Sequence, residues 1–457
     1  MDLKTIQQFA NDFFGITAVA KKLVGYDDLN YYLKANNGEE YILKIAHFEE
    51  VREFLEMQNT ALLHLEKKKF SFQIPQVILN KNGKITTIIK DEQGNERLLR
   101  LLTWVPGKLW FYANPHSESL LKNLGQVCGT LSNSLIDFDH PAAHRYSKWD
   151  NSQASWVVEY FHFIEDEKQR NIAEYFFKLF EKEALPKLSN LRKSICHNDV
   201  NDYNVLVSSG IENQQVAGVI DFGDLIYTNT INELAVSIAY VVMHKPDPLS
   251  AAALVVKGFH EKFPLKEEEL EVLFPLIAAR LLISATSSAI GQKQYPENKY
   301  LKVSEKPAWD LLEKLRLIPP GLAHFTFRNA CGLESCSENV VFQNWVNAKK
   351  ENFANIVGLD LNREYVHPMD LAINSLELGN NDEFSTPSKF NQKINSMLIE
   401  ANCEIGLGGY GEVRPFYTTD AYQVEGNNGP QWRTVHLNRH LDKARHTYLY
   451  PIGRQGA

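Results

Sequence analysis

Two short polar runs near the middle of the chain contain the residue types that phosphoryl transfer needs. The first places a histidine, an aspartate and an asparagine at His197, Asp199 and Asn204, and the second ends an apolar segment in Asp221. Phosphoryl transfer requires a carboxylate that orients and deprotonates an acceptor hydroxyl, and oxygen ligands that hold magnesium on the phosphates. The spacing therefore suggests Asp199 as the base, with Asn204 and Asp221 as ligands of Mg²⁺.

The order of the two runs strengthens an otherwise weak signal. A lone His-x-Asp is often a capped turn, and an aspartate that ends a strand is often a helix N-cap. Here the first run leads into an apolar strand, a turn at residues 213–215, a second apolar strand and then Asp221. This is the chain order of a protein-kinase-like C-lobe. The combination predicts phosphoryl transfer from a nucleotide.

The segments before these runs alternate strand and turn signals, as expected of a small β lobe. Residues 40–45 read as a strand, and its Lys44 would point into a covered cleft and hold nucleotide phosphates. Gly25 stands alone in the preceding turn, where a glycine-containing loop would cover the phosphates. Residues 74–78 and 85–89 read as a hairpin, because Asn-Gly lies between them.

A helix should follow the lysine strand, because apolar residues recur at helical spacing over residues 51–65. Gln58 falls on the same face as these apolar residues. A protein kinase normally has a glutamate there, which pairs with the lysine. Gln58 offers a hydrogen bond without a charge, so it is a candidate support for the nucleotide site. Glu53 and Glu56 lie on other faces, and the partner of Lys44 stays open.

The remaining chain divides into a helical lobe and a different C-terminal region. The predicted fold is α+β, a two-lobed protein-kinase-like fold with an antiparallel β N-lobe, a mainly helical C-lobe and a C-terminal α+β fragment. Residues 272–290 are the most apolar stretch, but Arg280 interrupts them, so a buried helix is favoured over a membrane span. The predicted boundaries are 1–105 for the N-lobe, 106–320 for the C-lobe, 321–350 for a linker helix and 351–457 for the fragment.

Composition narrows the class of protein further. A chain of 457 residues with 44% hydrophobic content can bury a substantial core. The net charge of −8 gives no electrostatic reason to bind nucleic acid or an anionic membrane. No secretion signal is evident after Met1, so the cytoplasm is expected, where the five scattered cysteines would stay reduced. A zinc site at Cys331 and Cys336 is not expected, because no second ligand pair follows closely.

Residues 1 to about 320 resemble the aminoglycoside phosphotransferase and choline kinase superfamily. The motifs are Tyr41-Ile42-Leu43-Lys44, His197-Asn198-Asp199 with Asn204, and Ile220-Asp221-Phe222-Gly223-Asp224. Within it the chain is most similar to the hydroxylysine kinase branch. Four further motifs indicate this branch: Gln58-Asn59, Phe138-Asp139-His140-Pro141, Lys148-Trp149-Asp150 and Asn232-Glu233-Leu234-Ala235.

This resemblance implies a fold and a set of roles. The fold would have a five-stranded N-lobe over a helical C-lobe, and ATP or GTP would donate the phosphate. Lys44 would bind phosphate, Asp199 would act as the base, and Asn204 and Asp221 would hold Mg²⁺. His197, also a candidate catalytic residue, would brace the loop.

The acceptor implied by the resemblance is a small amino alcohol or a hydroxy amino acid, with hydroxylysine-like compounds favoured. Choline, ethanolamine, homoserine and aminoglycosides stay open. An ammonium group needs carboxylates or aromatic faces nearby. The candidates, each also readable as a structural cap or a core aromatic, are Asp150, Asp202, Asp224, Glu233, Trp104 and Trp149. A catalytically decayed remnant is the alternative, and the intact Lys44, Asp199, Asn204 and Asp221 argue against it.

The far end resembles a truncated lysostaphin-type zinc metallopeptidase module. In large bacterial fusion proteins such a module follows a kinase of this branch and precedes an aminotransferase-like module. The similarity lies in residues 410–414 and 431–437, but the aspartate expected four positions after His436 is replaced by His440. Without that ligand no catalytic zinc site is expected. Shifting a back-translation of residues 439–457 by one nucleotide restores the expected pattern, which suggests a frameshifted gene.

Overall fold

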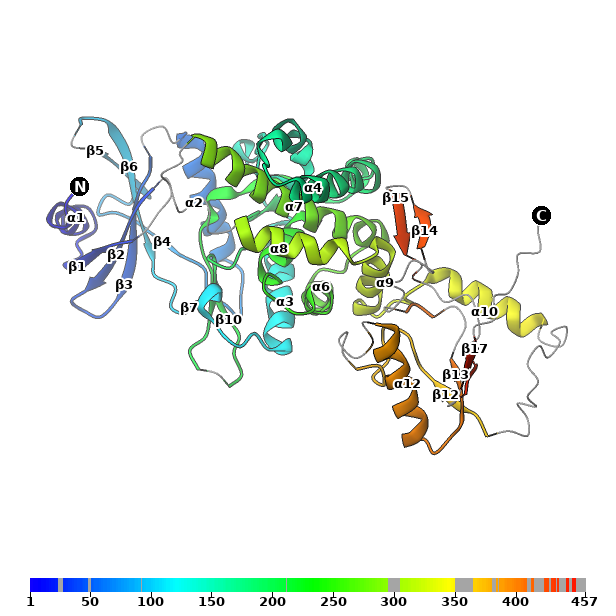
Figure 1. Ribbon diagram of the computed structural model, residues 1–457. Helices are drawn as coiled ribbons and strands as arrows, with labels where there is room; N and C mark the ends of the chain where they lie inside the picture. The colour runs from blue at the N-terminus through cyan, green and yellow to red at the C-terminus, as the bar shows by residue number, and fades with distance from the viewer. Residues whose placement is uncertain are drawn as a thin grey trace.

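The chain forms a β lobe, a helical lobe and a smaller C-terminal part (Figure 1). The α+β two-lobed fold predicted from the sequence is confirmed. The computed structural model describes residues 1–23, 28–47, 51–91, 93–210, 212–294, 305–349, 365–379, 384, 386–408, 412–414, 423–426, 429–432, 434, 441–443 and 446–448.

The N-lobe is built on a six-stranded antiparallel sheet in the order β1-β2-β3-β6-β4, with β5 also paired to β6. The sheet therefore has one strand more than the five that were expected. Alternation along β3 sets its two faces, because successive side chains of a strand point to opposite sides. Leu43 and Ile45 join the core formed with α1 (Leu3–Phe9), whereas Ile42 and Lys44 face the other way. The strands are β1 (Ala18–Lys22), β2 (Leu29–Ala35), β3 (Glu40–Ile45), β4 (Val77–Ile78), β5 (Thr86–Lys90) and β6 (Glu96–Thr103).

The predicted hairpin between residues 74–78 and 85–89 is wrong. The tight turn between them is present, but both strands pair with β6. Ile78 of β4 lies opposite Leu101 of β6, and Thr86 of β5 lies opposite Arg100 of the same strand. The physical reason is length: β4 has two residues, which is too short to hold a hairpin, whereas β6 has eight and offers one continuous edge.

Helix α2 (Arg52–Glu66) lies between the β lobe and the helical lobe (Figure 1). Its predicted apolar face is confirmed at Leu55, Leu62 and Leu65, which are buried, whereas Val51 is the N-cap residue and is exposed. Gln58 is buried on this helix as well. The helix therefore carries polar groups into the space between the lobes, where Gln58 and Asn59 reach Arg100 of β6.

The C-lobe is a stack of helices around the long helix α7. The 18-residue apolar window of α7 is 89% buried inside the protein, which makes it a core helix. Helices α3 and α6 approach closely, because a Cβ on Gly125 or Gly258 would lie 1.9 Å from a backbone oxygen of the other helix. The helices are α3 (Glu118–Leu135), α4 (Glu167–Leu179), α5 (Ile231–Val241), α6 (Pro248–Lys262), α7 (Glu267–Gln294), α8 (Glu305–Arg316) and α9 (Pro320–Ala330).

Two small sheets hold the ends of the polar runs. The predicted hairpin after the first run is confirmed as β9 paired with β10, and β7 pairs with the other edge of β9. A second pair, β8 with β11, was not predicted. The first run lies between β8 and β9, and the second lies between β10 and β11, so each loop is fixed at both ends. The strands are β7 (Lys108–Leu109), β8 (Lys193–Cys196), β9 (Val205–Val207), β10 (Val216–Val219) and β11 (Ile226–Asn229).

The helical lobe continues past the boundary expected at residue 320. Helix α9 buries Leu322, Ala323 and Phe327 in the main core, so it packs as part of the C-lobe. The next helix, α10 (Ser337–Lys349), buries none of its residues. The predicted linker therefore consists of one helix packed into the lobe and one lying on the surface.

The C-terminal part has a small core of its own, which includes Met369, Ile394 and Leu398. His436 and His440, on which the peptidase interpretation depends, lie outside the described residues. That interpretation stays a prediction. The elements are β12 (His367–Met369), α12 (Pro387–Glu400), β13 (Ile405–Gly408), β14 (Gln423–Gly426), β15 (Gly429–Trp432), β16 (Leu441–Lys443) and β17 (His446–Tyr448).

Candidate functional site

Asp199 lies at the centre of a hydrogen-bonded loop between β8 and β9. Its Oδ1 accepts from Asn201 Nδ2 at 3.0 Å and from Arg280 Nη2 at 2.9 Å. Its Oδ2 accepts from Asn204 Nδ2 at 2.7 Å. Burial and the negative charges of Asp224 and Asp221 raise the pKa of Asp199, and the positive charge of Arg280 opposes that shift. The charge of Arg280, 2.9 Å away, favours the ionised carboxylate, which is the form that can accept a proton.

His197 lies in the loop that carries Asp199 and is hydrogen-bonded on both ring nitrogens. Its side chain is fully buried, and its Nε2 lies 3.1 Å from Ile220 O while Asp199 N–H donates to Nδ1 at 3.3 Å. These partners place the ring proton on Nε2. Burial lowers the pKa of His197 to about 4, so the ring is neutral near pH 7. The histidine thus joins the loop of Asp199 to the residue before Asp221.

Asp221 has a left-handed backbone, with φ of 64°. Such a conformation is costly for a residue other than glycine and is typical of functional sites. Its side chain is 52% exposed, and Lys44 Nζ lies 3.4 Å from Oδ1. The charge of Lys44 lowers the pKa of Asp221, so the carboxylate is ionised near neutral pH. Lys44 from the N-lobe and Asp221 from the C-lobe therefore meet, which gives Lys44 the partner that the sequence left open.

Gln58 does not support Lys44 directly. Its Oε1 accepts from Arg100 Nη2 at 2.6 Å, and Asn59 Oδ1 accepts from Arg100 Nη1 at 2.8 Å. Arg100 lies opposite Lys44 in the register of β3 and β6. Lys44 Nζ also lies 3.8 Å from the carboxylate of Asp28. The helix therefore holds a second cation beside the lysine. Gly25 lies outside the described residues.

Glu233 supports the backbone of the loop that carries Asp199. It is buried at the start of α5, and its Oε2 accepts from Asn198 N–H at 3.1 Å. Asn198 also has a left-handed φ of 64°, so this hydrogen bond helps to hold a strained residue next to Asp199. Burial raises the pKa of Glu233 to about 7, although hydrogen bonds from the loop backbone oppose the shift.

The donor atoms at Asn204 and Asp221 suit magnesium. A carboxamide and an ionised carboxylate are hard oxygen ligands, which Mg²⁺ prefers, and it keeps part of its water shell. The two residues are close along the fold, because Ile220 N–H donates to Asn204 O at 2.9 Å. The described residues contain no cluster of three or more His, Cys, Asp or Glu that could hold a metal. A site for magnesium completed by waters and phosphate oxygens does not need one.

The structure narrows the candidates for an acceptor ammonium. Asp150 is buried and accepts from Thr228 Oγ1 at 2.7 Å, as a structural cap does. The face of Trp149 is covered by the guanidinium of Arg280, whose Cζ lies 5.2 Å from the ring centroid. Trp104 packs edge-on against Tyr32 in the N-lobe. Glu233 is hydrogen-bonded to the loop backbone, so Asp202 and Asp224 remain as candidates to bind the ammonium group.

Sequence reasoning missed the roles of Arg100 and Arg280. Gln58 lies 42 residues from Arg100, and Asp199 lies 81 residues from Arg280, so no local pattern links them. One signal was present: a single arginine in an otherwise apolar stretch must find a buried partner.

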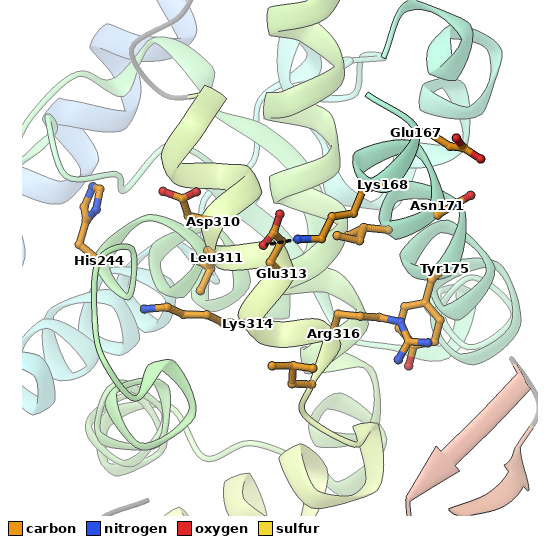
Figure 2. A pocket seen from close by; sticks show the side chains of 12 residues that line it. Glu167, Lys168, Asn171, Tyr175, His244, Asp310, Leu311, Glu313, Lys314 and Arg316 are labelled. Carbon is orange, nitrogen blue, oxygen red and sulfur yellow. Dashed lines mark ion pairs between the residues drawn. The ribbon is translucent and has the colours of Figure 1, made fainter. Parts of the chain in front are cut away.

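A large cavity lies away from these residues. It has a volume of about 1070 Å³ and lies between α4 and α8 (Figure 2). Lys168 pairs with Glu313 at 2.9 Å, and the guanidinium of Arg316 stacks 3.8 Å above the ring of Tyr175. Its lining includes none of the predicted site residues, and its acidic and basic side chains balance. The cavity therefore does not define the candidate site.

Three kinds of comparison relate the chain to known proteins. Residues 21–265 match the phosphotransferase enzyme family. Hydroxylysine kinase from Mus musculus is 29% identical over 316 residues, covering 64% of this chain and 83% of that protein. The enzyme of the same name from Xenopus laevis is 30% identical over 331 residues, covering 67% and 88%. The structure of an amicoumacin kinase in complex with AMP-PNP and Ca²⁺ has a TM-score of 0.52 at 16% identity, over 69% of this chain and 94% of that one, which is a likeness of fold.

Proposed function

The chain belongs to the phosphotransferase enzyme family and is a small-molecule kinase, and from this premise we propose that it transfers the γ-phosphate of ATP or GTP to the hydroxyl of a small amino alcohol or hydroxy amino acid. The main observation behind the proposal is that a residue of the N-lobe contacts one of the polar runs of the C-lobe. Asn204 holds Asp199 at 2.7 Å, and Lys44 of the N-lobe reaches Asp221 at 3.4 Å.

In the proposed reaction, Asp199 orients the acceptor hydroxyl and takes its proton. Lys44 binds the phosphates, and Arg100 adds a second positive charge on the neighbouring strand. Asn204 and Asp221 would hold Mg²⁺, which when bound offsets charge on the phosphate oxygens. His197 and Glu233 act on the loop that carries Asp199, and neither exchanges a proton with the substrate.

Hydroxylysine-like acceptors are favoured within the proposed substrate class. Relatives named hydroxylysine kinase match this chain over 83% to 88% of their length. An ammonium near the accepting hydroxyl would need a carboxylate close to Asp199, and Asp202 and Asp224 are suitably placed in sequence. Burial raises the pKa of Asp202 to about 6, a shift that a bound cation would reverse.

A panel of acceptors tests the proposal. The panel contains hydroxylysine, ethanolamine, choline, homoserine and an aminoglycoside, each with ATP or GTP and Mg²⁺, and release of nucleoside diphosphate is measured. We expect hydroxylysine to give the highest kcat/KM and the Asp199→Asn variant to give none. A higher kcat/KM for an acceptor without an amine would refute the proposed class. Inactivity toward the whole panel would favour the decayed remnant.

The assignments outside the kinase site are also proposals. We propose that residues 351–457 are an incomplete peptidase-like module without a catalytic zinc site. Metal analysis of the purified full chain would contradict this if it gave stoichiometric zinc together with peptidase activity. A cytoplasmic location is supported by the five cysteines, all of which are free thiols.

A further inference from the structure

Arg280 is a buried cation in the middle of α7, with 2% of its surface exposed. Each of its three guanidinium nitrogens has a partner on a different segment. Nη1 donates to Trp149 O at 2.6 Å, Nη2 to Asp199 Oδ1 at 2.9 Å, and Nε to Tyr240 Oη at 3.2 Å. The planar guanidinium, which is always charged, is therefore also fixed in position.

Two aromatic rings confine the guanidinium further. Its Cζ lies 5.2 Å from the centroid of Trp149 and 5.4 Å from that of Tyr240. The Tyr240 hydroxyl is in turn hydrogen-bonded to Ser284 Oγ at 2.8 Å, on the same helix as Arg280. Both rings attract the cation through their faces. The arginine thus has little freedom to leave Asp199.

The surroundings of Arg280 are acidic. Asp199 and Asp224 both stabilise its charge, and the charge of Arg280 in turn acts on Glu233. Burying an arginine costs free energy, and packing alone would be served as well by an apolar residue. Its contact with the carboxylate of Asp199 therefore points to a role in the reaction.

The contacts of Asp199 distinguish its two oxygens. Among the residues that the structure describes, Oδ1 accepts from both Arg280 and Asn201, whereas Oδ2 accepts from Asn204 alone. A carboxylate has roughly two acceptor sites on each oxygen. Oδ1 is therefore saturated, and Oδ2 keeps the capacity to accept a proton.

We propose that Arg280 is a positioning residue of the phosphoryl-transfer site, which holds Oδ1 of Asp199 so that Oδ2 faces the acceptor hydroxyl. The proposal rests on the proposed function. In the step, a bond forms between the acceptor oxygen and the γ-phosphorus, and the bond from that phosphorus to the bridging oxygen breaks. The hydroxyl proton goes to Oδ2, and nucleoside diphosphate leaves.

The main test is the Arg280→Ala variant. Misplacement of a catalytic group by about 1 Å costs about 10²-fold in rate, and we expect a loss of kcat of that order. KM for the acceptor and Kd for the nucleotide should change by no more than about threefold. The contact between Arg280 and Asp199 is expected to lower the energy of the transition state and not that of the bound substrates. Added guanidinium at millimolar concentration should restore kcat in a saturable manner. Sodium chloride at the same ionic strength should not.

Arg192→Ala is the matched control. Arg192 is also paired with a buried carboxylate, at 2.7 Å from Glu269 Oε1, and it also stacks on a ring, 4.2 Å above Phe263. It lies away from the catalytic loop contacts. This variant should lose thermal stability while keeping kcat, and guanidinium should leave its kcat unchanged. The comparison separates loss of folding from loss of positioning.

Arg280→Lys keeps the charge and decides the question if the alanine variant fails to fold. One ammonium cannot reproduce the planar fork, so kcat should fall at constant acceptor KM. Unchanged kcat in Arg280→Lys would overturn the proposal, as would a folded alanine variant that guanidinium does not rescue. If wild type phosphorylates no acceptor, the proposed function fails instead. Basal nucleotide hydrolysis by water then gives the same comparison of variants.

Discussion

At the scale of single residues, the site depends on hydrogen bonds that fix one carboxylate. Asp199 receives donors from two asparagines and one arginine. The neighbouring Asn198 adopts a left-handed conformation that Glu233 holds through the backbone. A residue in such a conformation costs about 1 to 3 kcal/mol, and here it directly precedes the proposed base Asp199.

The first prediction concerns this base. Asp199→Asn should lower kcat by at least about 10³-fold, because the amide cannot accept the hydroxyl proton, whereas general bases contribute about 10² to 10⁴. Nucleotide affinity should stay nearly unchanged, since binding depends on Lys44 and the metal ligands. Steady-state kinetics together with calorimetry of nucleotide binding check both parts. A variant that keeps most of its turnover would show that another group is the base.

The second prediction compares Lys44 with Gln58. Lys44→Ala should raise the nucleotide KM more than Gln58→Ala does, because the lysine meets phosphate charge directly and charge-assisted hydrogen bonds are about twice as strong as neutral ones. Gln58 acts one step away, through Arg100. Titration of nucleotide with both variants tests the order. A larger effect of Gln58→Ala would mean that the placement of Arg100 controls binding.

At the scale of elements, the sequence predicted features that depend on neighbouring residues, such as the bounds of a strand. Strand β3 was predicted with its observed bounds, because a short apolar run follows an Asn-Gly turn there. The β4 and β5 pairing was wrong, because the sequence cannot tell which edge a short strand will join. The contacts of Gln58 and Arg280 were missed, because their partners come from distant strands and loops. The metal-ligand role proposed for Asp221, in contrast, rests on its place just after β10.

The third prediction concerns α5, which carries Glu233. Burial raises its pKa from 4.5 to about 7, so the folded protein binds the proton more tightly than the unfolded chain. The contribution is fully present below about pH 4.5 and is lost as the pH rises toward 7. A shift of this size is worth about 3 kcal/mol at most. Urea unfolding at pH 5 and pH 8 should show this loss in wild type.

Glu233→Gln provides the control for α5. Glutamine cannot ionise but retains an oxygen that can accept from Asn198 N–H. The variant should therefore lose less unfolding free energy than wild type between the two pH values. Equal losses in both proteins would assign the pH dependence to other groups.

At the scale of the whole molecule, the kinase unit is longer than its motifs. Helix α9 buries Phe327 in the main core, whereas α10 buries nothing. The C-lobe boundary expected at residue 320 would leave α9 outside the kinase unit. Removing α9 would instead expose the core of the C-lobe.

The fourth prediction follows from this packing. A chain ending at residue 336 should keep kinase activity and thermal stability, and a chain ending at Pro319 should lose stability. Loss of several buried side chains costs about 2 to 5 kcal/mol each. Thermal unfolding and kinase activity of the two truncated chains check this. Equal stability would mean that α9 only rests on the surface.

The contact between Lys44 and Asp221 also predicts how the overall dimensions of the molecule respond to salt. It joins the two lobes through opposite charges 3.4 Å apart, and the aspartate is half exposed to solvent. Dissolved ions weaken such a contact, because the screening length falls from about 10 Å at 0.1 M salt to about 3 Å at 1 M. Without nucleotide, the molecule should therefore have a larger radius of gyration at 1 M salt, measured by X-ray scattering. Lys44→Met should have the larger radius at both salt concentrations, so the distance between the lobes would respond to the ionic composition of the solution.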